Sequence, residues 1–143
     1  MRWENLRRVF GGKADRSLDE VKGIEARPLT EREAGWVRDI LRVNDEWRDA
    51  DVSQTQVVAE GPSTEGYSLL LESPEPENPA TKSKQESVGN LWIQTDDGST
   101  INVQLSQFEG RLRELYVLFV DPKHPNRKLP EKWTETSREA ASV

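Results

Sequence analysis

Three segments in which polar and apolar residues alternate, joined by two short loops that each contain a glycine, constrain the fold of this chain most. The segments are Val88–Thr95, Thr100–Gln107 and Arg111–Val120. Alternation with a period of two predicts β-strands with one buried face, and loops this short join antiparallel strands. Two more candidate strands, Thr55–Glu60 and Gly66–Glu72, precede them. We therefore predict an antiparallel meander of about five strands.

The length of the first loop follows from the faces of its flanking strands. A three-residue loop at 96–98 pairs Ile93 with Ile101 on one face and Trp92 with Asn102 on the other. A two-residue loop would instead mix apolar and polar side chains on both faces. Register is set by the buried face, and a three-residue loop ending in glycine is a common hairpin type. We therefore predict the three-residue loop.

The adjacent carboxylates of Asp96 and Asp97 in this loop suggest either a metal site or a turn. A calcium loop of the EF-hand type needs oxygen ligands at alternating positions and a glutamate six residues after its glycine. The residue six positions after Gly98 is Gln104. We interpret both aspartates as turn residues.

The second loop is predicted at 108–110, which places Val103 opposite Leu115 and Ile101 opposite Val117. With this register, seven side chains share one continuous apolar face of the sheet. They are Leu91, Ile93, Ile101, Val103, Leu115, Val117 and Phe119.

An amphipathic helix is predicted from Thr30 to about Val43, because Thr30 and Glu33 form a capping box. Its apolar stripe contains Ala34, Trp36, Val37, Ile40, Leu41 and Val43. A stripe this wide must pack against another element. We expect the helix to cover the apolar face of the sheet, which gives an α+β fold.

Other regions surround this helix and sheet. The predicted organisation is an N-terminal amphipathic helix at 1–12, a linker at 13–27, the α+β domain at 28–133 and a flexible tail at 134–143. Trp3 and Phe10 lie on the apolar face of the N-terminal helix, where they would dock on the sheet or on a partner. A proline-rich loop at Ser73–Glu86 is expected to be mobile.

The sequence offers few residues for catalysis or metal binding. It contains no cysteine, and its single histidine, His124, lies in a proline-rich segment. It also contains no glycine-rich phosphate loop. We predict no catalytic residues, no metal and no cofactor, and a protein that is not an enzyme.

Acidic residues concentrate in the middle of the chain. The formal net charge is −6, and residues 45–77 contain nine acids and one base. This balance argues against nucleic-acid binding and favours a basic partner. The candidate contact residues are Asp45, Glu46, Asp49 and Asp51. We expect a cytoplasmic protein, because cysteine is absent and no apolar run reaches the length of a membrane span.

The sheet face opposite the expected helix holds large apolar side chains among polar ones. Trp92, Tyr116, Leu118 and Val120 fall on this face, although the solvated face of an antiparallel sheet is normally polar. Either the N-terminal helix or the segment around Trp133 covers these side chains, or the face binds a partner.

Four segments of the chain resemble a family of small bacterial proteins classed as a domain of unknown function. They are RPLTEREAGWVRDIL, QVVAEGPSTEGYSLLL, VGNLWIQTDDGSTINVQL and FEGRLRELYVLFVD. The shared features are the R-P-L-T helix start, the D-G turn and the G-R-L-x-x-L motif of the last strand. These motifs are structural, so the resemblance implies no catalytic residues. Related small α+β proteins often act as immunity partners of secreted bacterial toxins, and the resemblance implies a role of that kind.

Three functions remain open from the sequence. The leading hypothesis is a protein-binding domain of the immunity type, whose acidic segment contacts a basic partner. The second is a small-molecule or regulatory binding module that uses the face of Trp92 and Tyr116. The third is a peripheral membrane protein held by Trp3 and Phe10 of the N-terminal helix. The oligomeric state is open as well, because edge strands can pair between chains.

Overall fold

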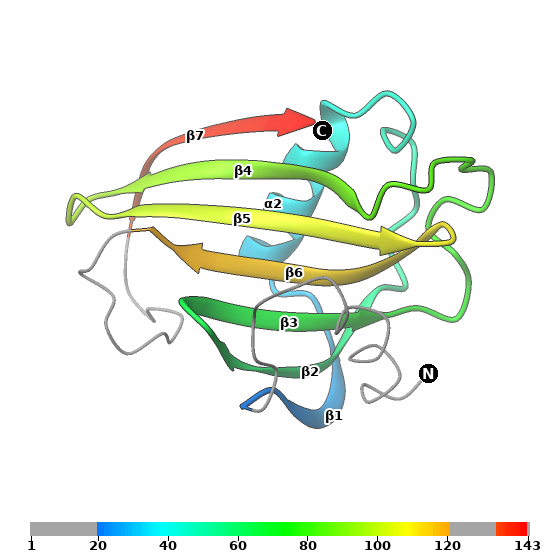
Figure 1. Cartoon of the computed structure of the whole chain (residues 1–143), viewed down its shortest axis with the longest axis horizontal. Helices are drawn as coiled ribbons and strands as arrows, with labels where there is room; N and C mark the ends of the chain where they lie inside the picture. The colour runs from blue at the N-terminus through cyan, green and yellow to red at the C-terminus, as the bar shows by residue number, and fades with distance from the viewer. Residues whose placement is uncertain (1–19, 121–133, 143) are drawn as a thin grey trace.

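A computed structural model describes residues 20–120 and 134–142 of the chain. These residues form one antiparallel sheet of seven strands with one helix packed on it (Figure 1). The elements are β1 (Lys22–Pro28), α2 (Glu31–Arg42), β2 (Gln56–Ser63), β3 (Gly66–Glu72), β4 (Ser87–Thr95), β5 (Thr100–Phe108), β6 (Arg111–Phe119) and β7 (Glu135–Ser142). The predicted α+β class is confirmed, with seven strands in place of about five.

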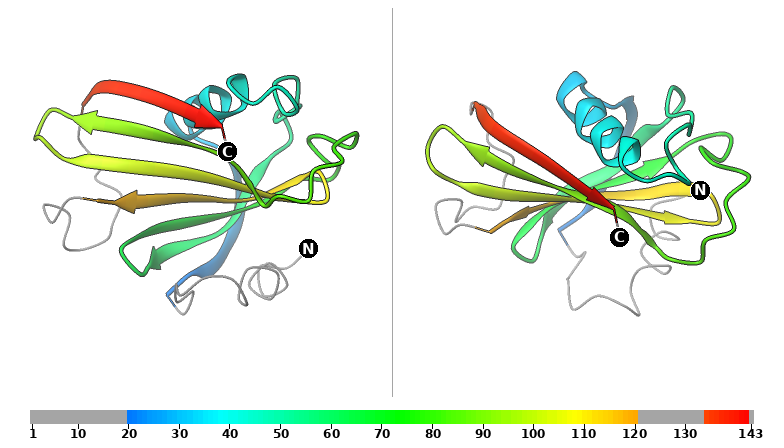
Figure 2. Two further views of the ribbon diagram at one scale, coloured as in Figure 1. Left: turned by 45° about the horizontal axis from the view of Figure 1, so that its top comes forward. Right: turned by 90° about the horizontal axis from the view of Figure 1, so that it is seen from above.

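The strand order across the sheet is β1-β2-β3-β6-β5-β4-β7. Neighbouring strands are antiparallel throughout the described sheet. The two side views show α2 lying across one face of the twisted sheet (Figure 2). The opposite face of β4, β5 and β7 therefore has no helix of the described chain on it.

The two outermost strands correct the predicted organisation. Residues 22–27, expected in a linker, belong to β1, and residues 135–142, expected in a flexible tail, form β7 beside β4. Both strands are mostly exposed and contain charged residues, because an edge strand is paired on one side only and charged residues protect its free side. They therefore lack the alternation that identifies half-buried strands. The N-terminal helix predicted at 1–12, with Trp3 and Phe10, lies outside the described residues.

The first hairpin has the predicted register. Ile93 pairs with Ile101 and Trp92 with Asn102. Gly98, the last residue of the loop, has a φ of 82°, which is the left-handed conformation that glycine adopts without steric cost. The alternation of the two strands was therefore sufficient to fix both faces.

The second hairpin differs from its prediction by two residues, because Val103 pairs with Val117 and not with Leu115. Glu109 (φ 52°) and Gly110 (φ 82°) form a two-residue loop, and both have the positive φ of a type I′ turn. A β-bulge near the start of β6 adds a second step to the shift. From Glu114 onward, the shift of two residues leaves the side chains of β6 on their predicted faces. Leu112, which lies before the bulge, is shifted by one residue and belongs to the core on the helix side.

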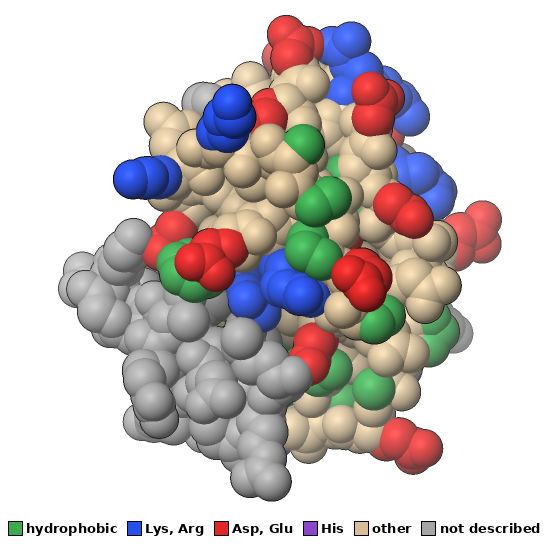
Figure 3. All heavy atoms as spheres, turned by 90° about the vertical axis from the view of Figure 1, so that its right-hand side faces the viewer, with side chains coloured by type: hydrophobic (Ala, Val, Ile, Leu, Met, Phe, Trp, Pro, Cys, Tyr) green, Lys and Arg blue, Asp and Glu red, His purple; other side chains and the backbone are tan. Residues whose placement is uncertain are grey.

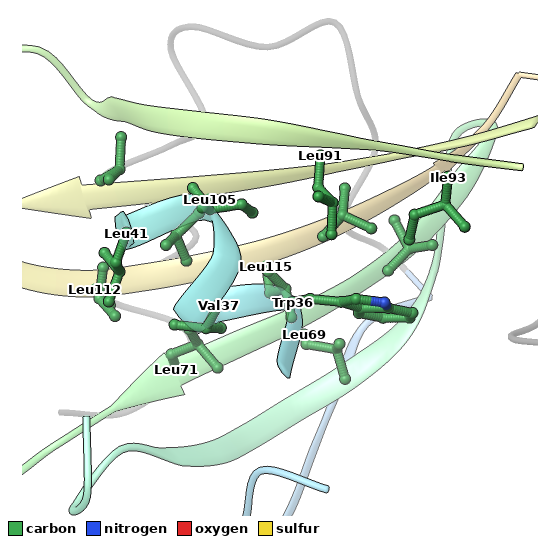
Figure 4. Close-up of a cluster of buried hydrophobic side chains, with 14 of the residues drawn as sticks. Trp36, Val37, Leu41, Leu69, Leu71, Leu91, Ile93, Leu105, Leu112 and Leu115 are labelled. Carbon is green, nitrogen blue, oxygen red and sulfur yellow. The ribbon is translucent and has the colours of Figure 1, made fainter. Parts of the chain in front are cut away.

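The core lies between α2 and the sheet. Thr30 caps the helix in the predicted box, since its side chain accepts from the Glu33 backbone N–H and the Glu33 carboxylate accepts from the Thr30 N–H. Figure 4 shows helix side chains pointing onto leucines of the central strands. Those labelled in the figure are Trp36, Val37, Leu41, Leu69, Leu71, Leu91, Ile93, Leu105, Leu112 and Leu115, all buried.

The loop between β3 and β4 is predicted to be mobile, but it forms several hydrogen bonds to the rest of the domain. Asn78 donates its N–H to the carbonyl oxygen of Gly110 at 2.9 Å, and the Asp51 N–H donates to the carbonyl of Glu77 at 3.1 Å. The Glu77 carboxylate is buried and accepts from the N–H of Leu112 at 3.0 Å. The loop is therefore anchored to the start of β6.

A network of charged and phenolic groups fixes β1 against α2 and the next two strands. The Arg27 guanidinium donates two hydrogen bonds to the Glu33 carboxylate, at 2.9 and 3.1 Å. Arg27 also contacts Glu60 at 3.4 Å. Tyr67 donates its hydroxyl to Glu60 Oε2 at 3.0 Å. Burial, and then this hydrogen bond, raise the pKa of Tyr67 to about 12.

The raised pKa of Tyr67 predicts a loss of stability in strong base. An unfolded tyrosine ionises near pH 10, so the neutral phenol stabilises the fold fully below that pH, and this contribution disappears as the pH rises to about 12. We expect Tyr67→Phe to remove this part of the pH dependence and the corresponding rise in absorbance near 295 nm. Ionisation of Tyr67 near pH 10 in the folded protein would contradict the prediction.

Candidate functional site

The sheet face opposite α2 is buried around Leu70 of β3 but exposed around Trp92 of β4, and this exposed part is called the open face below. It brings together two of the predicted contact residues. Trp92 on β4 pairs with Asn102 on β5, which in turn pairs with Leu118 on β6. Directly paired residues project to the same side of a sheet, so Trp92 and Leu118 lie in one row across three strands. Trp92 is 46% exposed and Val120 is 48% exposed.

Tyr116, the third predicted residue of this face, is not at the surface. Its side chain is 6% exposed, and its hydroxyl donates to the carbonyl oxygen of Ser63 at 3.0 Å. A buried phenol with a satisfied hydroxyl is a structural residue. Of the two predicted aromatic residues of this face, Trp92 is exposed and Tyr116 is not.

Side-chain amides fix the surroundings of Trp92. Gln104 donates to Asn102 Oδ1 at 2.9 Å, and Asn102 donates to Asn90 Oδ1 at 3.2 Å. On the next row, the Thr100 hydroxyl donates to Gln94 Oε1 at 3.1 Å. Connected polar groups hold one another in place. Trp92 therefore stands among ordered side chains that form hydrogen bonds with one another.

Glu139 is a member of this face that sequence reasoning missed. It lies on β7 directly opposite Trp92 and is exposed. The prediction failed because residues 134–143 were expected to form a tail, and a tail residue has no fixed neighbours. Residues 135–142 show no alternation of polar and apolar side chains, so the sequence gives no signal of this strand.

The predicted acidic contact surface is mixed with basic residues. Asp45 forms an ion pair with Arg48, and Glu46 accepts a hydrogen bond from the Ser83 N–H at 3.2 Å. Asp51 accepts from the hydroxyl and the N–H of Ser53, at 2.7 and 3.0 Å, and these bonds lower its pKa.

Three arginines from the end of α2 and the following turn border the same region. Arg38, Arg42 and Arg48 line a hollow of about 530 Å³, together with Asp51 and other residues. Figure 3 shows acidic and basic side chains intermixed over the end of the sheet where β5 meets β6. Asp49 is exposed nearby, but the four predicted acids do not form a surface of one sign. The excess of acids along the sequence is partly cancelled in space.

Other hollows lined by described residues lie away from Trp92. One of about 450 Å³ is bordered by Lys82, Lys84 and Phe108, and one of about 340 Å³ by Arg111 and Arg113. None of these three hollows is lined by Trp92, Tyr116 or Leu118, the residues of the predicted small-molecule site.

The aspartates of the first loop accept hydrogen bonds that hold the turn in place. Asp97 accepts from the Ser99 N–H at 3.0 Å and from the Thr95 hydroxyl. Asp96 accepts from the Thr134 N–H at 3.2 Å, which links the loop to the segment before β7. Across residues 20–120 and 134–142, no group of three or more histidines and carboxylates is placed to hold a metal ion. His124 lies outside these residues.

No helix within the described part of the chain has the length and apolar character needed to cross a membrane. Comparison of the chain with protein-family models, with curated proteins and with solved structures gives no match. The resemblance to a family of small bacterial proteins therefore stays a prediction.

Proposed function

We propose that this protein is a non-enzymatic binding domain that recognises another protein through the open sheet face around Trp92. The observation that supports the proposal most is the 46% exposure of Trp92 on a regular strand, among side chains fixed by hydrogen bonds. Tryptophan is among the residues that contribute most to binding when it anchors an interface.

The rigidity of the face supports binding without a large entropic cost. Trp92 sits on β4, which is paired on both sides, with β5 and β7. A partner that docks there does not have to order a loop, and ordering costs reduce affinity. Leu118 and Val120 add apolar area, and the amides of Asn90 and Gln104 offer hydrogen bonds at the border of the contact.

The immunity-type hypothesis changes in one respect. We place the contact on the sheet face, because Asp45, Glu46, Asp49 and Asp51 are interleaved with arginines. The net charge of −6 still favours association with a basic protein through long-range steering. Such steering weakens as salt screens the charges, so the association rate should fall with ionic strength.

Exchange of Trp92 tests this function, with Phe108 as the matched control. Phe108 is also an exposed aromatic residue (38%) but lies at the far end of β5. We expect Trp92→Ala to lower the affinity for a partner captured from the source organism at least about tenfold, and Phe108→Ala to change it less than about twofold. The affinities are measured with the purified partner by calorimetry.

Three outcomes separate the proposed function from its alternatives. Equal losses for Trp92→Ala and Phe108→Ala would show that the contact is not centred on Trp92. Retained binding in both variants, with a loss on changing Asp45 and Asp49 to asparagine, would restore the acidic segment as the contact surface. Membrane association that disappears on deletion of residues 1–12 would support the third hypothesis, which concerns residues outside those described.

A further inference from the structure

We propose that Trp92 and Glu139 together form a recognition site for a basic side chain of the partner, with arginine preferred to lysine. The proposal rests on the proposed function and specifies what the Trp92 face binds. It concerns one position on the face, where an exposed indole ring and an exposed carboxylate are neighbours on adjacent strands.

The β4–β7 ladder brings the two groups together. Trp92 and Glu139 are paired residues in this ladder, and the Cβ atoms of directly opposed residues in antiparallel strands are about 4.5–5.5 Å apart on the same face. A cation seated over the indole ring can therefore also reach the carboxylate. Both side chains belong to regular strands, so their spacing is fixed by the sheet.

The charge of Glu139 is not compensated within the described structure. None of the ion pairs found among residues 20–120 and 134–142 includes Glu139. The nearest arginine in sequence, Arg138, is engaged on the helix side, where it bonds to Asp39 at 2.6 Å and to Glu135 at 2.5 Å. An arriving cation therefore does not compete with a resident one.

The rest of the surface around Trp92 is neutral. The side chains that share its face on the neighbouring strand positions are Asn90, Gln94, Thr100, Asn102, Gln104, Ser137 and Ala141. Glu139 is thus the one charged group of this neighbourhood among the described residues. Its carboxylate and the electron-rich face of the indole ring both attract a cation, whereas a neutral or acidic side chain gains neither interaction.

Arginine fits the pair better than lysine. Its planar guanidinium stacks on an aromatic ring and binds a carboxylate through two parallel N–H donors. The ammonium group of lysine is more strongly hydrated and offers no flat surface. The site therefore discriminates by shape as well as by charge.

The test uses two synthetic peptides and the full-length protein. One is acetyl-(Gly-Arg)₄-amide, and the other replaces each arginine with citrulline, which keeps the shape of the side chain but removes its charge. Binding is followed by the NMR signals of the indole N–H groups, with the Trp92 signal assigned through a Trp92→Phe variant. Glu139→Gln removes the carboxylate, and Asp49→Asn removes an equal charge at a distant exposed site.

We expect the arginine peptide to shift the Trp92 indole signal, and the citrulline peptide to bind at least about tenfold more weakly. Glu139→Gln should raise the Kd of the arginine peptide about fivefold, and Asp49→Asn less than twofold. Equal effects of the two variants, or a Trp92 signal that does not move, would overturn the proposal, because the peptide would then respond to net charge alone.

Partner binding separates a failure of this proposal from a failure of the proposed function. If Trp92→Ala abolishes binding of the partner and Glu139→Gln leaves it unchanged, the sheet face is the contact surface but not a site for a basic side chain. If neither variant affects the partner, both proposals are wrong. If both variants weaken binding and Phe108→Ala does not, both are supported.

Discussion

Replacing Trp36 with alanine is expected to lower the free energy of unfolding by about 3–5 kcal/mol. The side chain is completely buried between α2 and the sheet, where it belongs to the main apolar cluster (Figure 4). Its removal leaves a cavity that the regular sheet below cannot fill by relaxing. The loss is a large share of the total stability of a domain of this size, which is about 5–15 kcal/mol.

The indole N–H of Trp36 adds a second contribution. It donates to Glu135 Oε1 on β7 at 2.8 Å, so the same residue fastens the edge strand to the helix. Trp36→Phe keeps most of the apolar contact but leaves that carboxylate without this donor, at a cost of about 1–3 kcal/mol. The difference in the free energy of unfolding between Trp36→Ala and Trp36→Phe separates the contribution of packing from that of the hydrogen bond to Glu135.

Urea denaturation followed by circular dichroism measures both variants, with Trp92→Ala as the control. Trp92 has the same side chain but is 46% exposed, and its removal should change stability by less than about 1 kcal/mol. Similar losses for Trp36→Ala and Trp92→Ala would contradict the placement of α2. They would imply that the open face of the sheet is packed as tightly as the helix-covered one.

Local patterns predicted the central part of the fold because each one depends on a buried face. The register of Ile93 with Ile101 followed from alternation, and the start of α2 followed from the capping box of Thr30 and Glu33. In both cases an alternative arrangement would bury polar groups or expose apolar ones. The helix and sheet faces were therefore fixed by the sequence around them.

The edges of the sheet and the details of the second hairpin did not follow from local patterns. β1 and β7 bury few side chains, so their residues show no alternation to detect. The pairing of Val103 with Val117 depends on a positive φ at Glu109 and on a bulge, and a glutamate gives no sign of either. Such features depend on how the strands pack against their neighbours, which the local sequence does not show.

The candidate site was predicted in part for the same reason. Trp92 and Leu118 lie on regular central strands, and they share a face as expected. Glu139 was missed because its position depends on β7, and the burial of Tyr116 depends on its bond to Ser63, 53 positions away. The acids at 45–51 were overvalued because counting along the chain ignores the arginines that fold beside them.

A second large effect is expected at Glu77, where alanine should lower the free energy of unfolding by about 3 kcal/mol. The residue is 3% exposed and lies in the long loop between β3 and β4. One carboxylate oxygen accepts from the Leu112 N–H at 3.0 Å and the other from the Thr55 hydroxyl at 2.5 Å. Alanine leaves both buried donors without this acceptor, and each such loss costs about 1–3 kcal/mol.

The Glu77→Gln variant distinguishes the role of Glu77 as a hydrogen-bond acceptor from a role of its negative charge. The amide oxygen can still accept from Leu112, and the amide N–H₂ can donate to the Thr55 oxygen once that hydroxyl rotates. We therefore expect glutamine to cost less than half of the loss caused by alanine. Equal losses would mean that the negative charge itself stabilises the loop, and negligible losses for both would mean that the loop is not anchored through Glu77. Hydrogen exchange of the Leu112 amide reports the same bond directly, since its protection should fall in Glu77→Ala and persist in Glu77→Gln.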